Sequence, residues 1–237
     1  MPRLVIGFLV VLLSSCATDR LATVQQNLAY AAQERLKNTL AFLFTNELGK
    51  GVGSVIATLA QPGGYLDNPL ARILLPPPLG LAFDVARDMQ ANPKATLLTA
   101  LMNHAAEQAI PGAAPIIQAA LNKVTPVEAR QLLDGDKTAA AEYLKAKTAE
   151  SLREVLTPLV AADLTASGAQ QVYGELLDTY QAQRTPAIDE KTVTLDESKR
   201  DLAQYVTAQA VDGAFKALGA QETRIRDNLS NLAGGAL

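Results

Sequence analysis

Apolar residues recur three or four positions apart along most of this chain, with polar residues between them. In the first such stretch they are Leu21, Val24, Leu28, Ala31, Leu36, Leu40, Leu43 and Phe44. Because 3.6 residues make one helical turn, this spacing gathers apolar side chains on one face of an amphipathic α-helix. We predict a helix to about Leu48, ended by Gly49, and a second short helix over residues 52–59.

The same spacing continues through the rest of the chain. It predicts helices over residues 79–89, 93–110, 115–124, 126–133, 137–164, 170–182 and 198–218. Pro158 is expected to kink the longest of these, and Gly219 to interrupt the last. Hydrophobic residues make up 49% of the sequence, which is enough to bury a core. The predicted fold class is all-α, an irregular multi-helix bundle.

The stretch "QPGGYLDNPLARILLPPPLG", residues 61–80, breaks the helical pattern. Its prolines and glycines prevent a continuous helix. Its many apolar residues are nevertheless unusual for a solvated linker, so we expect an ordered, packed loop that is extended near Ile73–Leu75. Asp67 and Arg72 flank the Asn-Pro turn and are candidates for an ionic clasp.

Two capping boxes and one polar segment indicate the domain organisation. Thr125 and Thr194 are each followed three residues later by glutamate, the pattern that opens a helix. The polar segment at about 183–197 resembles a linker. We predict a signal peptide over 1–15 and a single helical domain over 16–237, with a loop at 183–197 and a docked C-terminal helix.

The only cysteine, Cys16, follows an apolar run from Leu4 to Leu13. This run is about half the ~20 residues of a membrane-crossing helix and matches the apolar region of a secretory signal peptide. Leu13-Ser14-Ser15-Cys16 resembles a bacterial lipobox, which predicts cleavage before Cys16 and its acylation. Lipoproteins that are retained in the inner membrane carry Asp directly after the acylated cysteine. Ala17 stands at that position here, which favours the outer membrane. The alternative is an ordinary signal peptide with an incidental cysteine.

Charge and composition argue against a nucleic-acid partner. The formal net charge is −3, there is no tryptophan, and aromatic residues make up 5%. Nucleic-acid binding requires a basic surface and usually aromatic stacking platforms. The predicted contacts are therefore the membrane, through acylated Cys16, and a lipid or an envelope protein.

No stretch carries a complete catalytic, cofactor or metal motif. Asp134-Gly135-Asp136 lacks the later ligands of a calcium loop, and these aspartates are expected to cap the next helix instead. The glycines of residues 49–54 fit neither phosphate-binding motif. His104 is the only histidine, and Glu107 lies one helical turn away, so a proton-transfer pair or a structural hydrogen bond is conceivable. We predict no cofactor and no metal.

Several stretches together resemble the bacterial family catalogued as domain of unknown function 4197. They are Gly64-Tyr65-Leu66 to Asn68-Pro69, Arg72-Ile73 to Leu75-Pro76, Met102 to Glu107, Thr125 to Ala129, Leu133 to Tyr143, Tyr205-Val206, Val211-Asp212-Gly213 to Phe215, and Glu222 to Asn228. The resemblance covers most of the mature chain. It implies an α-helical, exported, often lipobox-bearing protein without an assigned activity.

The chain departs from the family pattern at a few positions. His104 stands where the family typically has arginine, Asp134-Gly135 replaces a double glycine, and Ala141 replaces a threonine. A shared histidine or threonine catalyst is therefore disfavoured. The polar positions that match are expected to form a polar cluster: Asn68, Arg72, Asn103, Glu107 and Arg226.

The sequence favours a non-enzymatic, periplasm-facing lipoprotein that binds a hydrophobic ligand or an envelope protein in grooves between its helices. Two alternatives remain. One is a structural envelope scaffold without a ligand, and the other is a hydrolase-type enzyme that uses Asn103, Glu107 and Arg72.

Overall fold

A computed structural model describes residues 3–77, 79–82, 92–183 and 201–232, and their side chains except at residues 3–23, 81–82 and 183. The described chain forms helices and no strands, which confirms the all-α prediction. The helices are α1 (Arg3–Leu59), α2 (Leu79–Ala82), α3 (Pro93–Ala109), the 3₁₀-helix η1 (Ile110–Gly112), α4 (Ala113–Leu121), α5 (Pro126–Leu133), α6 (Ala139–Ala166), α7 (Ala169–Gln183) and α8 (Leu202–Leu232).

Helix α1 does not end at Gly49; that prediction is wrong. It runs for 57 residues from Arg3 and continues past Gly49 to Leu59. Leu48, Val52, Ile56 and Leu59 are buried on one face across the glycines, so tertiary packing outweighs their low helix propensity. A Cβ at Gly49 would lie 3.3 Å from the side chains of Gln118 and Leu121, which shows how closely α4 packs there.

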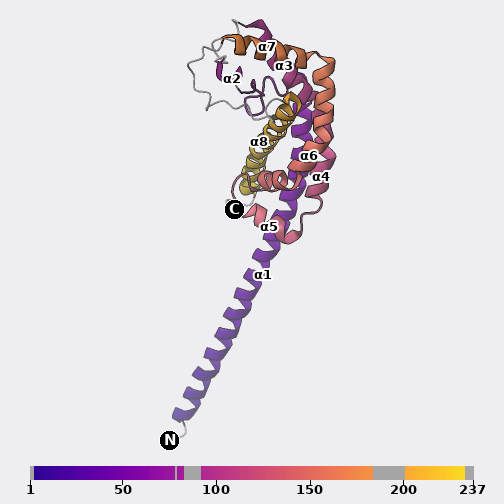
Figure 1. The fold of residues 1–237 in the computed structure, drawn as a ribbon. Helices are drawn as coiled ribbons and strands as arrows, with labels where there is room; N and C mark the ends of the chain where they lie inside the picture. The colour runs from indigo at the N-terminus through magenta and orange to yellow at the C-terminus, as the bar shows by residue number, and fades with distance from the viewer. Residues whose placement is uncertain (1–2, 78, 83–91, 184–200, 233–237) are drawn as a thin grey trace.

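Helix α8 likewise continues through Gly219, against the predicted interruption. It packs against α6 and α1 (Figure 1). A Cβ at Gly219 would lie 3.0 Å from Thr138 Cγ2, and one at Gly213 would lie 2.8 Å from Ala71 Cα. These glycines therefore bring the start of α6 and the 61–77 loop against α8, and they do not end the helix.

The core lies where α1, α3, α6 and α8 meet. Its largest fully buried side chains are mostly leucines, together with Tyr65, Phe44, Ile73, Met102 and Ile110. The irregular 61–77 loop contributes to this core, because Ala71, Ile73 and Leu75 are buried while Arg72 and Leu74 are exposed. This alternation is typical of extended chain and confirms the ordered, packed segment near Ile73–Leu75.

Local helix signals are also confirmed where the structure describes them. Thr125 and Glu128 form the predicted capping box at the start of α5. Pro93 opens α3, with the Asn92 side chain accepting hydrogen bonds from the first turn. The expected helix over 83–89, the Thr194 capping box and most of the 183–197 loop lie outside the described residues.

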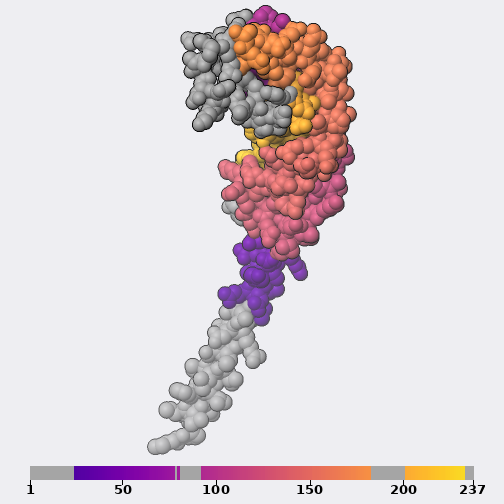
Figure 2. Space-filling view, viewed as in Figure 1, coloured from indigo at the N-terminus to yellow at the C-terminus, as the bar shows by residue number. Residues whose placement is uncertain are grey.

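The N-terminal part of α1 extends beyond the packed body as an arm (Figures 1 and 2). We use "arm" for residues 24–32, which are exposed; Glu34 already pairs with Arg130 of α5 at 2.8 Å, and Leu40 and Ala41 enter the core. In the described part of the chain, no helix is both long and apolar enough to cross a membrane. The side chain of Cys16 lies outside the described ones, so its lipidation stays a prediction.

Candidate functional site

Asn103 on α3 binds the backbone of the extended loop. Its side chain is fully buried, and its Oδ1 accepts the Ile73 N–H at 2.9 Å. Its Nδ2 donates to Ile73 O at 2.8 Å and to Thr99 O at 2.7 Å. The amide thus pairs with both polar groups of Ile73 as a neighbouring strand would, which satisfies backbone that would otherwise be buried without partners.

Glu107, one turn later on α3, binds the same loop closer to its start. Its Oε1 accepts the Tyr65 N–H at 3.2 Å, and the Tyr65 hydroxyl donates to Ala210 O of α8 at 3.0 Å. Burial, reinforced by the nearby Glu107 carboxylate, raises the pKa of Tyr65 well above its usual value. We call Asn103, Glu107 and Tyr65 the loop clamp.

Asn68 and Arg72 lie in the loop that this clamp holds. The Asn68 Oδ1 accepts the Leu70 N–H at 3.0 Å, and its backbone oxygen accepts the N–H groups of Ala71 and Arg72. Asn68 therefore shapes the turn before the extended segment. Arg72 is exposed on that segment, so its side chain is not buried beside Asn103.

A second polar arrangement lies on α8, where Glu222 and Arg226 hold the turn between α5 and α6. The fully buried Glu222 accepts the N–H groups of Ala140 and Ala141 at 3.0 and 2.8 Å. Arg226 donates to Leu132 O and Leu133 O at 2.6 and 2.7 Å. The negative carboxylate thus lies at the amino end of α6, and the positive guanidinium lies at the carboxyl end of α5. Each charge is stabilised by the dipole of the helix end that it contacts.

These two side chains also bind each other. Arg226 Nη2 lies 2.6 Å from Glu222 Oε1, and the Arg226 guanidinium stacks 4.7 Å from the centre of the Phe44 ring. We call Glu222 and Arg226 the turn clamp. The expected capping of α6 by Asp134 or Asp136 is wrong: Thr138 is the N-cap residue, its side chain makes no capping hydrogen bond, and Glu222 supplies the acceptors.

The predicted polar residues therefore lie in two places. Asn103 and Glu107 face the loop that contains Asn68 and Arg72, whereas Arg226 belongs to the turn clamp. Sequence reasoning did not single out Glu222. Its spacing of four residues from Arg226 was the available signal, since such pairs face each other on a helix.

His104 is half exposed beside the loop clamp. Its Nδ1 lies 4.0 Å from Glu107 Oε2, and its Nε2 lies 4.0 Å from Asp163 Oδ2. Neither distance is a hydrogen bond. No group of histidine, cysteine, aspartate and glutamate side chains within the described regions could hold a metal ion.

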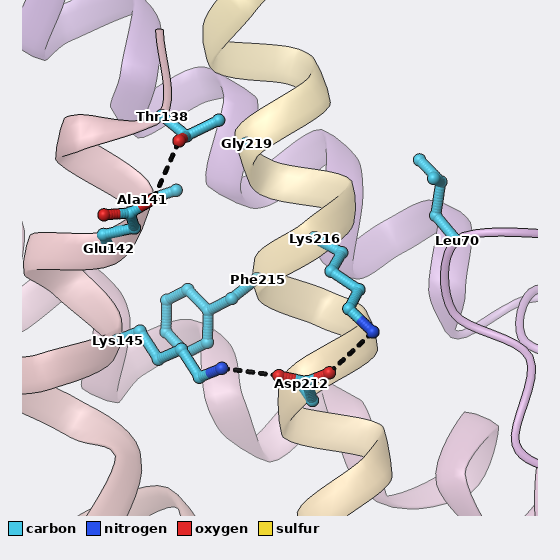
Figure 3. Close-up of a pocket in the computed structure, with 9 residues that line it drawn as sticks. All are labelled: Leu70, Thr138, Ala141, Glu142, Lys145, Asp212, Phe215, Lys216 and Gly219. Carbon is cyan, nitrogen blue, oxygen red and sulfur yellow. Dashed lines mark hydrogen bonds and ion pairs between the residues drawn. The ribbon is translucent and has the colours of Figure 1, made fainter. Parts of the chain in front are cut away.

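One candidate for recognition is an open groove between α6, α8 and the loop, with a volume of about 380 Å³ (Figure 3). Leu70 of the loop and Ala141, Phe215 and Gly219 form its apolar part. Figure 3 shows α8 running through the middle, with α6 on one side and Leu70 on the other. We call this the α6–α8 groove.

Charges of both signs line this groove. Asp212 accepts hydrogen bonds from Lys145 of α6 and lies 2.8 Å from Lys216 Nζ. Glu142 accepts the Thr138 hydroxyl at 3.0 Å. The hydrogen bonds from Lys145 and Lys216 lower the pKa of Asp212 below its usual value. The groove therefore offers an apolar floor with a fixed pattern of positive and negative groups.

Comparison with known proteins places this fold in a family. A family model described as "Protein of unknown function (DUF4197)" matches residues 36–234, which include both clamps and the α6–α8 groove. Neither the curated proteins nor the solved structures gave a match. The match covers most of the chain and confirms the resemblance seen in the sequence. The chain therefore belongs to the DUF4197 family.

Proposed function

We propose that this protein is a non-enzymatic lipoprotein that docks an envelope protein in the α6–α8 groove. Acyl chains on Cys16 would hold it at the outer membrane, facing the periplasm. The observation that carries this proposal is the groove itself, where an open apolar floor is bordered by the fixed Lys145–Asp212–Lys216 arrangement.

Charges of both signs favour a protein over a lipid as the occupant. A lipid offers one headgroup, whereas a protein surface offers an apolar side chain together with polar and charged groups around it. Leu70 is 48% exposed in the groove and provides an apolar contact at its edge. Ion pairs at such an edge contribute mainly to specificity and to the rate of association.

The exposed arm is consistent with an anchored protein. As a helix, residues 24–32 span about 14 Å, so an anchor at Cys16 would hold the body at a distance from the lipid surface. Acylation by more than one chain provides stable anchoring, whereas one chain is marginal. Mass spectrometry of the mature protein tests this part. Loss of residues 1–15 and added acyl mass on Cys16 are expected, and an unmodified Cys16 would contradict the anchor.

The docking part is tested by placing a photocrosslinking residue at position 70, in cells of the source bacterium. Position 97 is a matched control, because Leu97 on α3 is also 48% exposed but does not line the groove. We expect one discrete protein adduct from position 70, its loss on Lys145→Glu/Lys216→Glu, and none from position 97. Equal adducts from both positions would contradict the proposal.

Native mass spectrometry of the Cys16→Ser chain separates a protein partner from a small ligand. We expect no bound small molecule whose retention depends on Leu70 in the α6–α8 groove. An apolar metabolite that co-purifies, and that is lost from a Leu70→Asp variant but retained by Leu97→Asp, would replace the protein partner with a hydrophobic ligand.

A further inference from the structure

A second groove lies on the opposite flank of α6, between α6 and α4. Its volume is about 600 Å³. Pro115, Ile116, Ala119 and Ala120 of α4 form an apolar wall. Lys123, just after α4, and Lys147 of α6 are at its border, together with Ser151. We call this the α4–α6 groove.

The charge of this groove has a single sign. No aspartate or glutamate lines it, and neither Lys123 nor Lys147 forms an ion pair with any described carboxylate. Lys147 Nζ lies 5.5 Å from the centre of the Tyr143 ring, which leaves its N–H donors for another acceptor. Two such lysines are notable in a chain whose formal net charge is −3.

Hydrogen bonds from Thr125 and, to a smaller extent, the charge of Lys147 lower the pKa of Glu128. Glu128 accepts the Tyr143 hydroxyl at 3.2 Å, and it also accepts the N–H and hydroxyl of Thr125 at 2.8 and 2.7 Å. These bonds hold the carboxylate in the α5 capping box. The two lysines therefore line a groove that has no acidic residue in its lining.

An apolar wall beside two cations matches an amphiphile with one anionic end. Lysine ammonium groups bind a carboxylate as point charges, and the aliphatic wall can cover part of an acyl chain. We propose that the α4–α6 groove binds a fatty acid, with its carboxylate between Lys123 and Lys147 and its chain along Pro115, Ile116, Ala119 and Ala120. This site is separate from the α6–α8 groove and does not depend on it.

The test is a fluorescence-anisotropy titration of the full chain with anthroyloxy-stearate, with oleate as unlabelled competitor. Saturable binding that oleate displaces is expected. Oleyl alcohol, which has the chain without the charge, should compete at least about tenfold less well, because tenfold corresponds to a modest 1.4 kcal/mol. Inorganic phosphate, which has charge without a chain, should not compete.

Variants locate the site. Lys123→Gln/Lys147→Gln should weaken binding at least about tenfold, and Ala119→Phe should fill the groove and abolish it. The matched control is Lys50→Gln/Lys94→Gln, which removes the same charge from exposed lysines outside the groove. Circular dichroism checks that all variants are folded. No saturable binding, equal competition by oleyl alcohol, or an equal loss in the control pair would overturn the proposal.

Discussion

The loop clamp and the turn clamp both hold the backbone of a distant segment, but they differ in the charge of the side chains that do so. In both, a buried carboxylate on a helix accepts backbone N–H hydrogen bonds from a segment far away in the sequence, the 61–77 loop for Glu107 and the first turn of α6 for Glu222. Glu222 is additionally paired with Arg226 at 2.6 Å. No lysine or arginine forms an ion pair with Glu107 among the described residues, and the His104 imidazole lies 4.0 Å away, beyond hydrogen-bond distance. The loop clamp instead relies on the neutral amide of Asn103.

This difference indicates where each clamp is vulnerable. The turn clamp is electrostatically complete, so removal of one partner leaves the other buried and uncompensated. The loop clamp consists mostly of neutral hydrogen bonds. Loss of one leaves a buried backbone group unpaired, which costs less free energy than an unpaired buried charge.

The largest effect is expected for Glu222→Ala. It removes the acceptors for Ala140 and Ala141 and leaves the Arg226 guanidinium, whose side chain is 13% exposed, without its carboxylate. Breaking a buried pair in this way costs about 3–5 kcal/mol. Urea denaturation measures it, with Glu150→Ala as control, since Glu150 is 80% exposed in a surface pair. Similar losses of unfolding free energy in both variants would contradict a stabilising role of the turn clamp.

Asn103→Ala should have the next largest effect. It leaves the N–H and carbonyl of Ile73 without their side-chain partner in a buried site. Stranded buried groups cost about 1–3 kcal/mol each, so a loss of at least about 2 kcal/mol is expected in the same assay. Gln108→Ala, at an exposed position of the same helix, should change stability by less than about 0.5 kcal/mol. A null result for Asn103→Ala would mean that the loop does not need this amide.

Tyr65→Phe should cost about 1 kcal/mol, because it removes only the hydrogen bond to Ala210 O. In a plot of the free energy of unfolding against pH, this variant should also lose stability less steeply at alkaline pH than the wild type. The folded-state pKa of Tyr65 is raised, so its contribution is full below about pH 10 and is lost at higher pH as the unfolded chain releases the proton first. Stability measured against pH for both proteins checks this. Identical slopes above pH ~10 would contradict the assigned burial effect.

The smallest effect is expected for Glu107→Gln, which keeps an oxygen to accept the Tyr65 N–H. A change of less than about 1 kcal/mol is predicted, whereas Glu222→Gln, which also breaks an ion pair, should cost several times more. If the two glutamine variants were equally destabilised, the proposed contrast between the clamps would disappear.

The sequence predicted the parts of the fold that depend on neighbouring residues. Apolar spacing located most of the described helices, and the Thr125–Glu128 capping box marked the start of α5. Gly49 and Gly219 were misread as helix ends because propensity is local, whereas the reason for these glycines is the close approach of other segments.

The polar residues show the same limit. Asn103, Glu107 and Arg226 were recognised as notable, but their partners are backbone groups tens of residues away, which no local pattern reveals. Glu222 was missed although its spacing of four residues from Arg226 was a local signal, and Arg226 was grouped with residues that belong to the other clamp or its loop. Both grooves are also products of tertiary packing, since each combines residues from separate helices.

The central claim is that these buried polar side chains hold backbone in place, each clamp acting on its own segment. Amide hydrogen exchange of Ile73 and Ala141 in the wild type, Asn103→Ala and Glu222→Ala tests it directly. Asn103→Ala should accelerate exchange mainly at Ile73, and Glu222→Ala mainly at Ala141, beyond any common change from global stability. Unchanged exchange at Ile73 in Asn103→Ala, or the same pattern in both variants, would contradict the account.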